Sequence, residues 1–146
     1  MKKSSPLGDL HVRLDPNAFV ADPNLIRALG KHATTVPCRS DGVLFRQDEP
    51  STGVFILHDG VVTLSMMSQD GHSLFAVQAK PGSLLGLPGA ISNQPYTLSA
   101  TARAGAKVSF VSNADLTATM QSDPALSLKM LEVLAAEVRS ARRALY

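Results

Sequence analysis

Hydrophobic and polar positions change their spacing along the chain, and the longest stretch of one kind runs from residue 38 to residue 112. There, short runs rich in Val, Ile, Leu and Phe are separated by turn sequences. Asp-Gly between apolar runs favours a β-hairpin, and β-branched and aromatic residues favour strands. About eight such runs can be counted, which predicts a mainly β fold of two packed antiparallel sheets, as in a jelly roll. The turns are Asp41-Gly42, Asp59-Gly60, Asp70-Gly71 and Pro81-Gly82.

A short helix is predicted before the strands. Asp22 precedes Pro23, and an aspartate side chain can cap free backbone N–H groups while proline tolerates the first helical position. The apolar spacing that follows places Leu25, Ile26 and Leu29 on the inward face.

The same start signal recurs at Asp123-Pro124, after a second short helix over 113–123. No Gly or Pro follows, so the pattern predicts a helix of about 22 residues and about 33 Å that reaches the C-terminus. A small sandwich cannot cover all of such a helix, which favours a symmetric homodimer through it; the alternative is that the stripe packs onto its own sandwich. The stripe consists of Leu126, Met130, Val133, Leu134, Val138, Ala141 and Leu145.

Composition limits the class of protein. The chain has 146 residues, 45% of them hydrophobic and 18% charged, with a net charge of +2. These values predict one compact core and exclude a disordered chain. We divide the chain into an N-terminal extension (1–21), a β-sandwich with its short helix (22–122) and the C-terminal helix (123–146).

The cysteine content, the length of the apolar runs and the motifs present indicate the cellular compartment and the chemistry to expect. A single cysteine, Cys38, fits a reducing compartment, and no apolar run has the length of a membrane span, so we expect a cytoplasmic protein without a membrane partner. The histidines His11, His32, His58 and His72 lack the paired spacing of a metal site. No GxSxG or GK[ST] motif occurs, so neither a metal, a cofactor nor catalysis is expected.

Two segments carry a resemblance to a known family. "GVLFRQDEPSTGVFILHDGVVTLSM" and "PGSLLGL", in this order and before a long helix, resemble the cyclic nucleotide-binding domain of the CRP/FNR regulators, from about Asp22 to the C-terminus. The resemblance implies a double-stranded β-helix with flanking helices. It also implies a last helix that forms the dimer interface and leads to a helix-turn-helix domain. The sequence stops at Tyr146, so we expect no reading of DNA by this chain alone.

In that family the phosphate-binding cassette runs Gly-Glu-Leu, a short helix, then Arg-Ser or Arg-Thr. Here Gly86 matches the glycine, but Leu87 stands at the glutamate position and Gln94 and Pro95 at the Arg-Ser positions. No Arg or Lys occurs between residues 81 and 102. An Arg–phosphate contact contributes roughly 1.5–3 kcal/mol and the sugar contact about 1 more. We therefore expect no binding of cAMP or cGMP in the usual way.

The rest of the cassette leaves its use open. Pro88 suits a first helical position, and Gly86 and Gly89 allow a ligand to approach the backbone. Either a small uncharged or weakly anionic effector binds, or the cassette is a purely structural relic that binds no ligand. The large side chains of Leu87 and Tyr96 near Gly86 favour a pocket that the protein itself fills. The candidate ligand-binding residues are Gly86, Leu87, Pro88, Gly89, Gln94, Pro95, Tyr96 and Thr97.

Some relatives sense gases through haem, and His72, Cys38, Met66 or Met67 has the chemistry of an iron ligand, although none matches a family ligand position. The leading hypothesis is a dimeric sensor domain with an altered pocket. The alternative is a structural or interaction module that dimerises and binds no small molecule.

Overall fold

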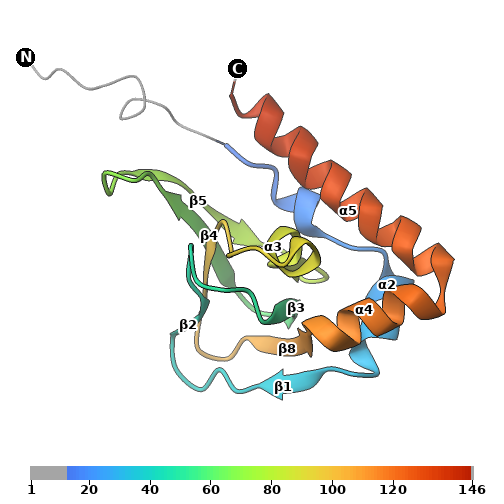
Figure 1. The fold of residues 1–146 in the computed structure, drawn as a ribbon. Helices are drawn as coiled ribbons and strands as arrows, with labels where there is room; N and C mark the ends of the chain where they lie inside the picture. Colours follow the sequence, from blue (N-terminus) through green and yellow to red (C-terminus); the bar gives the residue numbers. More distant parts are fainter. Residues whose placement is uncertain (1–12, 146) are drawn as a thin grey trace, which may run out of the picture.

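The computed structural model describes residues 13–145, and its strands form two antiparallel sheets of four strands each (Figure 1). The first sheet has the order β1 (Thr34–Val36), β8 (Lys107–Ser112), β3 (Gly53–Asp59) and β6 (Leu84–Leu85). The second has the order β2 (Gly42–Phe45), β7 (Ser99–Ala102), β4 (Val62–Met67) and β5 (Ser73–Ala79). The predicted mainly β fold of packed antiparallel sheets is confirmed.

Strand β3 shows why the core has two layers. Its residues from Gly53 to Leu57 are all buried. Because side chains alternate across a strand, Phe55 and Leu57 point toward the second sheet, whereas Val54 and Ile56 join a cluster with the helices. The first sheet is therefore covered on both faces, which explains its continuous apolar run.

Helix α2 (Pro23–Gly30) begins where the sequence predicts. The Asp22 carboxylate accepts a hydrogen bond from the backbone N–H of Asn24 at 2.8 Å. Leu25 and Leu29 are fully buried and Ile26 is partly buried, so the predicted inward face is confirmed.

Two further helices complete the layer on the first sheet: α4 (Asn113–Ser122) and α5 (Pro124–Arg143). Asp123 caps α5 by accepting from the N–H of Ala125 at 3.0 Å. Helix α5 has 20 residues and runs along one side of the molecule toward the C-terminus (Figure 1).

A one-turn 3-10 helix, η1 (Pro16–Phe19), comes from the segment assigned above to an N-terminal extension. Ala18 and Phe19 are buried in the core, and the N–H of Asp15 donates to Ser140 Oγ on α5 at 2.8 Å. This part of the extension thus packs with the domain. The remainder of it, residues 1–12 with His11, lies outside the described residues.

Helix α5 presents a different set of side chains to solvent from the predicted stripe. Met130 and Val133 are 0% and 3% exposed because they pack into their own domain. Leu126 and Leu134 are partly buried against the same cluster, whereas the stripe members Val138, Ala141 and Leu145 are exposed. The predicted stripe therefore combines two faces of the helix. The exposed large apolar residues of α5 are Leu128, Leu131 and Val138, and Leu145 lies just beyond the end of the helix.

Candidate functional site

The candidate cassette lies between β6 and β7 and contains the short helix α3 (Leu87–Ser92). Gly86 precedes the helix with a φ of 84°, a left-handed conformation that glycine adopts without a Cβ clash. Pro88 occupies the first turn, as predicted. Figure 1 shows α3 on the side of the roll that α5 borders.

Tyr96 fills the space beside this loop. Its ring is 3% exposed and stacks on Phe45 with a centroid distance of 4.2 Å. Its hydroxyl donates to the carbonyl of Gly53 at 2.8 Å and accepts from the N–H groups of Thr52 and Gly53 at 3.1 and 3.3 Å. The side chain is thus held at both its apolar and its polar end.

The two cassette glycines make room for the protein's own chain. A Cβ at Gly86 would lie 2.9 Å from Tyr96 Cε1, and one at Gly89 would lie 2.9 Å from the carbonyl oxygen of Gln94. The cavity that remains has a volume of about 10 Å³, the space of one water at most. The close approach predicted for a ligand is here made by residues 94–96.

The predicted cassette residues separate into two groups. Gly86, Pro88, Gly89, Tyr96 and Thr97 line the small cavity. The other three do not: Leu87 is fully buried in the cluster of the helical layer, and Gln94 and Pro95 are exposed. Of the two side chains expected to fill the pocket, Tyr96 therefore does so and Leu87 points elsewhere.

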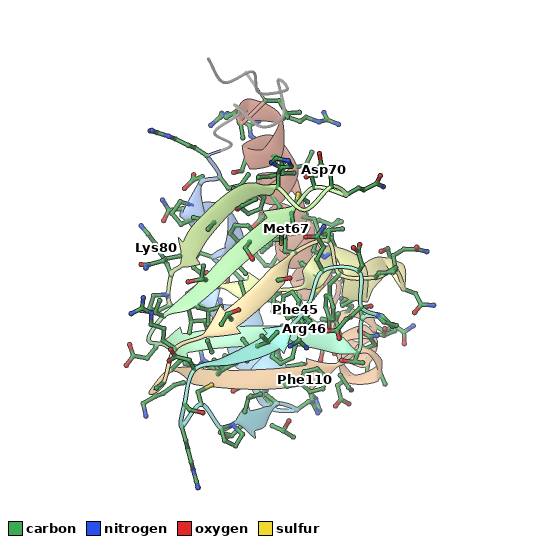
Figure 2. The ribbon with its side chains drawn as sticks, turned by 90° about the vertical axis from the view of Figure 1, so that its left-hand side faces the viewer. Phe45, Arg46, Met67, Asp70, Lys80 and Phe110 are labelled. Atoms are coloured by element: carbon green, nitrogen blue, oxygen red, sulfur yellow. The ribbon has the colours of Figure 1, made fainter. Side chains whose placement is uncertain are left out.

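A larger cleft opens beside the small cavity, between the β4–β5 hairpin and the C-terminal half of α5. It has a volume of about 270 Å³. The hairpin turn and the C-terminal end of α5 lie toward the same end of the molecule in both views, and Figure 2 labels Met67 and Asp70 near that turn. The cleft is lined by Leu14, Phe19, Met66, Leu74, Phe75, Thr97, Leu98, Glu137, Ser140, Ala141 and Leu145.

Within residues 13–145, Glu137 is the one charged side chain that lines either space, and it lines both. Burial raises the pKa of its carboxyl to about 8. Among the described residues no hydrogen bond or ion pair to this carboxyl is present to oppose that rise. The arrangement offers an acid in apolar surroundings, next to open space.

The sequence analysis did not select Glu137, although the helix period contains the signal. Leu126, Met130 and Val133 form the inward stripe of α5, and the next positions at steps of four and three are Glu137 and Ser140. Polar residues that continue a buried stripe are candidates for a site rather than for a solvated face.

The other residues considered above have ordinary surroundings. Cys38 Sγ donates to the carbonyl of Val36 at 3.5 Å, and His58 Nε2 lies 2.7 Å from Ser109 Oγ. His72 lies 3.7 Å from the Asp70 carboxylate in an exposed pair. In residues 13–145 no three His, Cys, Asp or Glu side chains gather as a metal site, and no helix has the length and apolar character to cross a membrane.

Comparison with known proteins agrees with this geometry. Residues 35–123 match the family model described as "Cyclic nucleotide-binding domain". The chain belongs to this family. No curated protein matches the sequence significantly.

Solved structures of CRP/FNR-type regulators share the fold of this cyclic nucleotide-binding domain. The Thermus thermophilus catabolite activator protein superposes with a TM-score of 0.71 at 18% identity, covering 90% of this chain and 62% of that protein. The N-terminal domain of a Streptomyces coelicolor transcriptional regulator gives 0.63 at 20% identity, with 93% and 94% covered. The sensor domain of the regulator DNR from Pseudomonas aeruginosa gives 0.63 at 20%, with 84% and 81% covered. The chain thus spans about three fifths of the Thermus protein and nearly all of the Streptomyces domain.

Proposed function

We propose that this domain is the effector-sensing part of a CRP/FNR-type transcriptional regulator, and that it does not bind cAMP or cGMP in the manner usual for its family. One observation carries the proposal: Tyr96 occupies the space beside Gly86, and its three hydrogen bonds hold it there. A cyclic nucleotide would need that space.

Charge supports the same conclusion. The described residues that line the small cavity include no Arg, Lys or His, while Glu137 adds an acid. A cyclic phosphate would lose its cationic partner and meet a group of the same sign once that acid ionises. Both contributions weaken binding of an anionic nucleotide.

The test is thermal unfolding of the purified chain with and without millimolar cAMP or cGMP, followed by calorimetric titration. A ligand that binds the native state raises the unfolding midpoint by mass action. We expect no shift with either nucleotide, and the Thermus catabolite activator protein serves as the comparison under the same conditions. A micromolar titration with this chain would refute the proposal.

We further propose that the domain forms a homodimer through the outward face of α5. Leu131 and Val138 on α5 and Leu145 just beyond its end are 57%, 48% and 71% exposed and recur every seven residues, with Leu128 one turn before the first. Such a repeat is typical of a helix-pairing surface. Sedimentation of Leu131→Lys/Val138→Lys should give a monomer, whereas the matched change Gln121→Lys on exposed α4 should leave the dimer intact.

The second candidate function is a module that dimerises through α5 and senses nothing, which the small volume of the cassette cavity favours. The two are separated by whether any small molecule stabilises the folded chain. In either case the domain regulates or assembles rather than catalyses, and the single cysteine suits the cytoplasm.

A further inference from the structure

The cleft between the β4–β5 hairpin and α5 has the composition of a binding site for an amphiphile. Its walls are mostly apolar, with Met66, Phe75 and Leu98 from the roll and Ala141 from α5. Leu145, just beyond the end of α5, lines the cleft and also belongs to the surface proposed above for dimerisation. Its volume of about 270 Å³ is just below the range of drug-sized pockets, so it suits a small molecule.

Two polar side chains that line this cleft, Thr97 and Glu137, have no hydrogen-bond partner within residues 13–145, and Glu137 is the ionisable one. Ser140 Oγ already accepts from the N–H of Asp15 at 2.8 Å, whereas the Glu137 carboxyl makes no hydrogen bond or ion pair within residues 13–145. A carboxyl in apolar surroundings is stabilised by a donor, most strongly by a cation. The cleft is therefore complementary to a donor or a cation.

Within the described residues, the elements around the cleft line it with uncharged side chains apart from Glu137. η1 and the residues before it contribute Leu14 and Phe19, the hairpin contributes Met66, Leu74 and Phe75, and the segment before β7 contributes Thr97 and Leu98.

Nearby titratable groups lie outside the cleft. Tyr96 belongs to the adjoining cavity, and its hydroxyl is bonded to the backbone of residues 52 and 53. Arg13, Asp15, Arg139 and Arg143 line a neighbouring groove that shares Leu14 and Ser140 with the cleft. Among the described residues that line the cleft itself, Glu137 is thus the charged group that a ligand meets.

We propose that this cleft binds a small amphiphilic amine, whose ammonium group donates to the carboxylate of Glu137 and whose apolar body lies against Met66, Phe75 and Leu98. The inference rests on the sensor function proposed above and gives it a ligand of opposite charge to a cyclic nucleotide. Binding of the cation ionises Glu137, which carries its proton at pH 7 because burial raises its pKa to about 8. One proton therefore passes to the solvent for each ammonium bound.

The experiment compares three probes of equal chain length, n-octylamine, 1-octanol and octanoate, by calorimetric titration of the full chain at pH 7. We expect the amine to bind at least tenfold more tightly than the alcohol, and octanoate to bind most weakly. Titrations in phosphate and in Tris, which differ in ionisation enthalpy, should report release of about one proton per amine. Binding of the amine to apolar surface alone would release none.

Three variants locate the site. Glu137→Gln should remove both the preference for the amine and the proton release while the alcohol still binds. Glu132→Gln, an exposed position on the same helix, should change neither. Ala141→Phe should fill the cleft and weaken both probes, which keeps the test informative if Glu137→Gln folds poorly.

The outcomes separate this proposal from the sensor function. Equal affinity for amine and alcohol, or an unchanged preference in Glu137→Gln, refutes the amine but leaves a ligand-binding cleft and the sensor function standing. Micromolar binding of cAMP would instead overturn the proposed function. If no probe binds and the chain is a dimer, a second copy covers the cleft and the amine proposal fails.

Discussion

The small cavity beside Gly86 and the cleft beside α5 adjoin each other but differ in the volume that they leave open. Both are lined by Phe19, Thr97, Leu98 and Glu137. The first is closed to about 10 Å³ by one aromatic ring with a fully bonded hydroxyl. The second keeps about 270 Å³ and an acid that has no partner among residues 13–145. Two adjoining spaces of one domain therefore differ in what occupies them: a side chain of the protein itself fills the first, whereas the second stays open beside an acid.

The largest effect is expected from Tyr96→Ala, which removes the side chain that fills the cavity beside Gly86. The change removes the stack on Phe45 and three hydrogen bonds, and a large-to-small aromatic change in a core typically costs about 3–5 kcal/mol. We expect a loss of this size in the free energy of unfolding, measured by urea denaturation.

Tyr96→Phe is the matched control, because it keeps the ring and removes the hydroxyl. It should cost about 1–3 kcal/mol, as the buried backbone groups of Gly53 and the part-buried N–H of Thr52 lose their partner. A loss below about 1 kcal/mol for Tyr96→Ala would mean that the ring does not support the core in solution.

The cleft beside α5 is tested by the pH dependence of the free energy of unfolding, compared between Glu137→Gln and the wild type. Burial raises the pKa of Glu137 from 4.5 to about 8, so the folded chain holds this proton more tightly than the unfolded chain. The protonated Glu137 carboxyl therefore makes its full contribution to the stability of the folded chain below pH 4.5, and this contribution is lost as the pH rises toward 8. Glutamine cannot ionise, so the variant should be more stable than the wild type at pH 8.5, by about 2–4 kcal/mol, with a flatter profile.

Urea denaturation at several pH values between 5 and 9 measures this difference. Glu132→Gln, exposed on the same helix, provides the control and should parallel the wild type throughout. Parallel profiles for Glu137→Gln and the wild type would show that the carboxyl is well solvated in the folded chain, and would weaken the contrast between the two spaces.

A smaller loss of stability is expected from alanine at Gly86, where close packing and the left-handed backbone conformation both contribute. Gly86→Ala meets both a φ of 84° and the Tyr96 ring, whereas Gly71→Ala meets a φ of 87° with nothing within 4 Å of the added Cβ. Both should lose about 1–2 kcal/mol from the left-handed conformation. Gly86→Ala should lose about 1–3 kcal/mol more from overpacking, as measured by thermal or urea unfolding. Equal losses would indicate that the ring yields easily.

The smallest expected effect comes from restoring the family arginine alone. Gln94 is exposed, and the space beside Gly86 is filled, so Gln94→Arg should leave stability within about 0.5 kcal/mol and create no measurable affinity for cAMP. Calorimetric titration checks this. Micromolar binding by the single variant would show that the missing charge, rather than the filled space, is what excludes the nucleotide.

Local signals in the sequence predicted much of the fold. The Asp-Pro pairs at 22–23 and 123–124 begin helices α2 and α5 as expected, because capping and the fixed φ of proline act over a few residues. The glycine turns and the apolar runs predicted the two sheets, because they too act over a few residues. The pairing of β3 with β6 and with β8, distant in the chain, has no local signature.

The site was less accessible to such reasoning. The absence of an arginine and a glutamate from the cassette is visible in the sequence, but whether its space is empty is not. Tyr96 and Leu87 are both large apolar residues near Gly86, and only packing sends one beside the loop and the other into the helical layer. The face of α5 that each leucine occupies was decided in the same way, by which side chains the sheet and α2 could bury.

By itself the sequence determined the two packed antiparallel sheets, the helices around them and the absence of Arg and Lys between residues 81 and 102, because periodicity, caps and residue identity are local properties. The tertiary structure decided that Tyr96 closes one space and that Glu137 borders another, since both depend on volumes enclosed by segments far apart in the chain. Burial then gives the Glu137 carboxyl a pKa that no local pattern specifies.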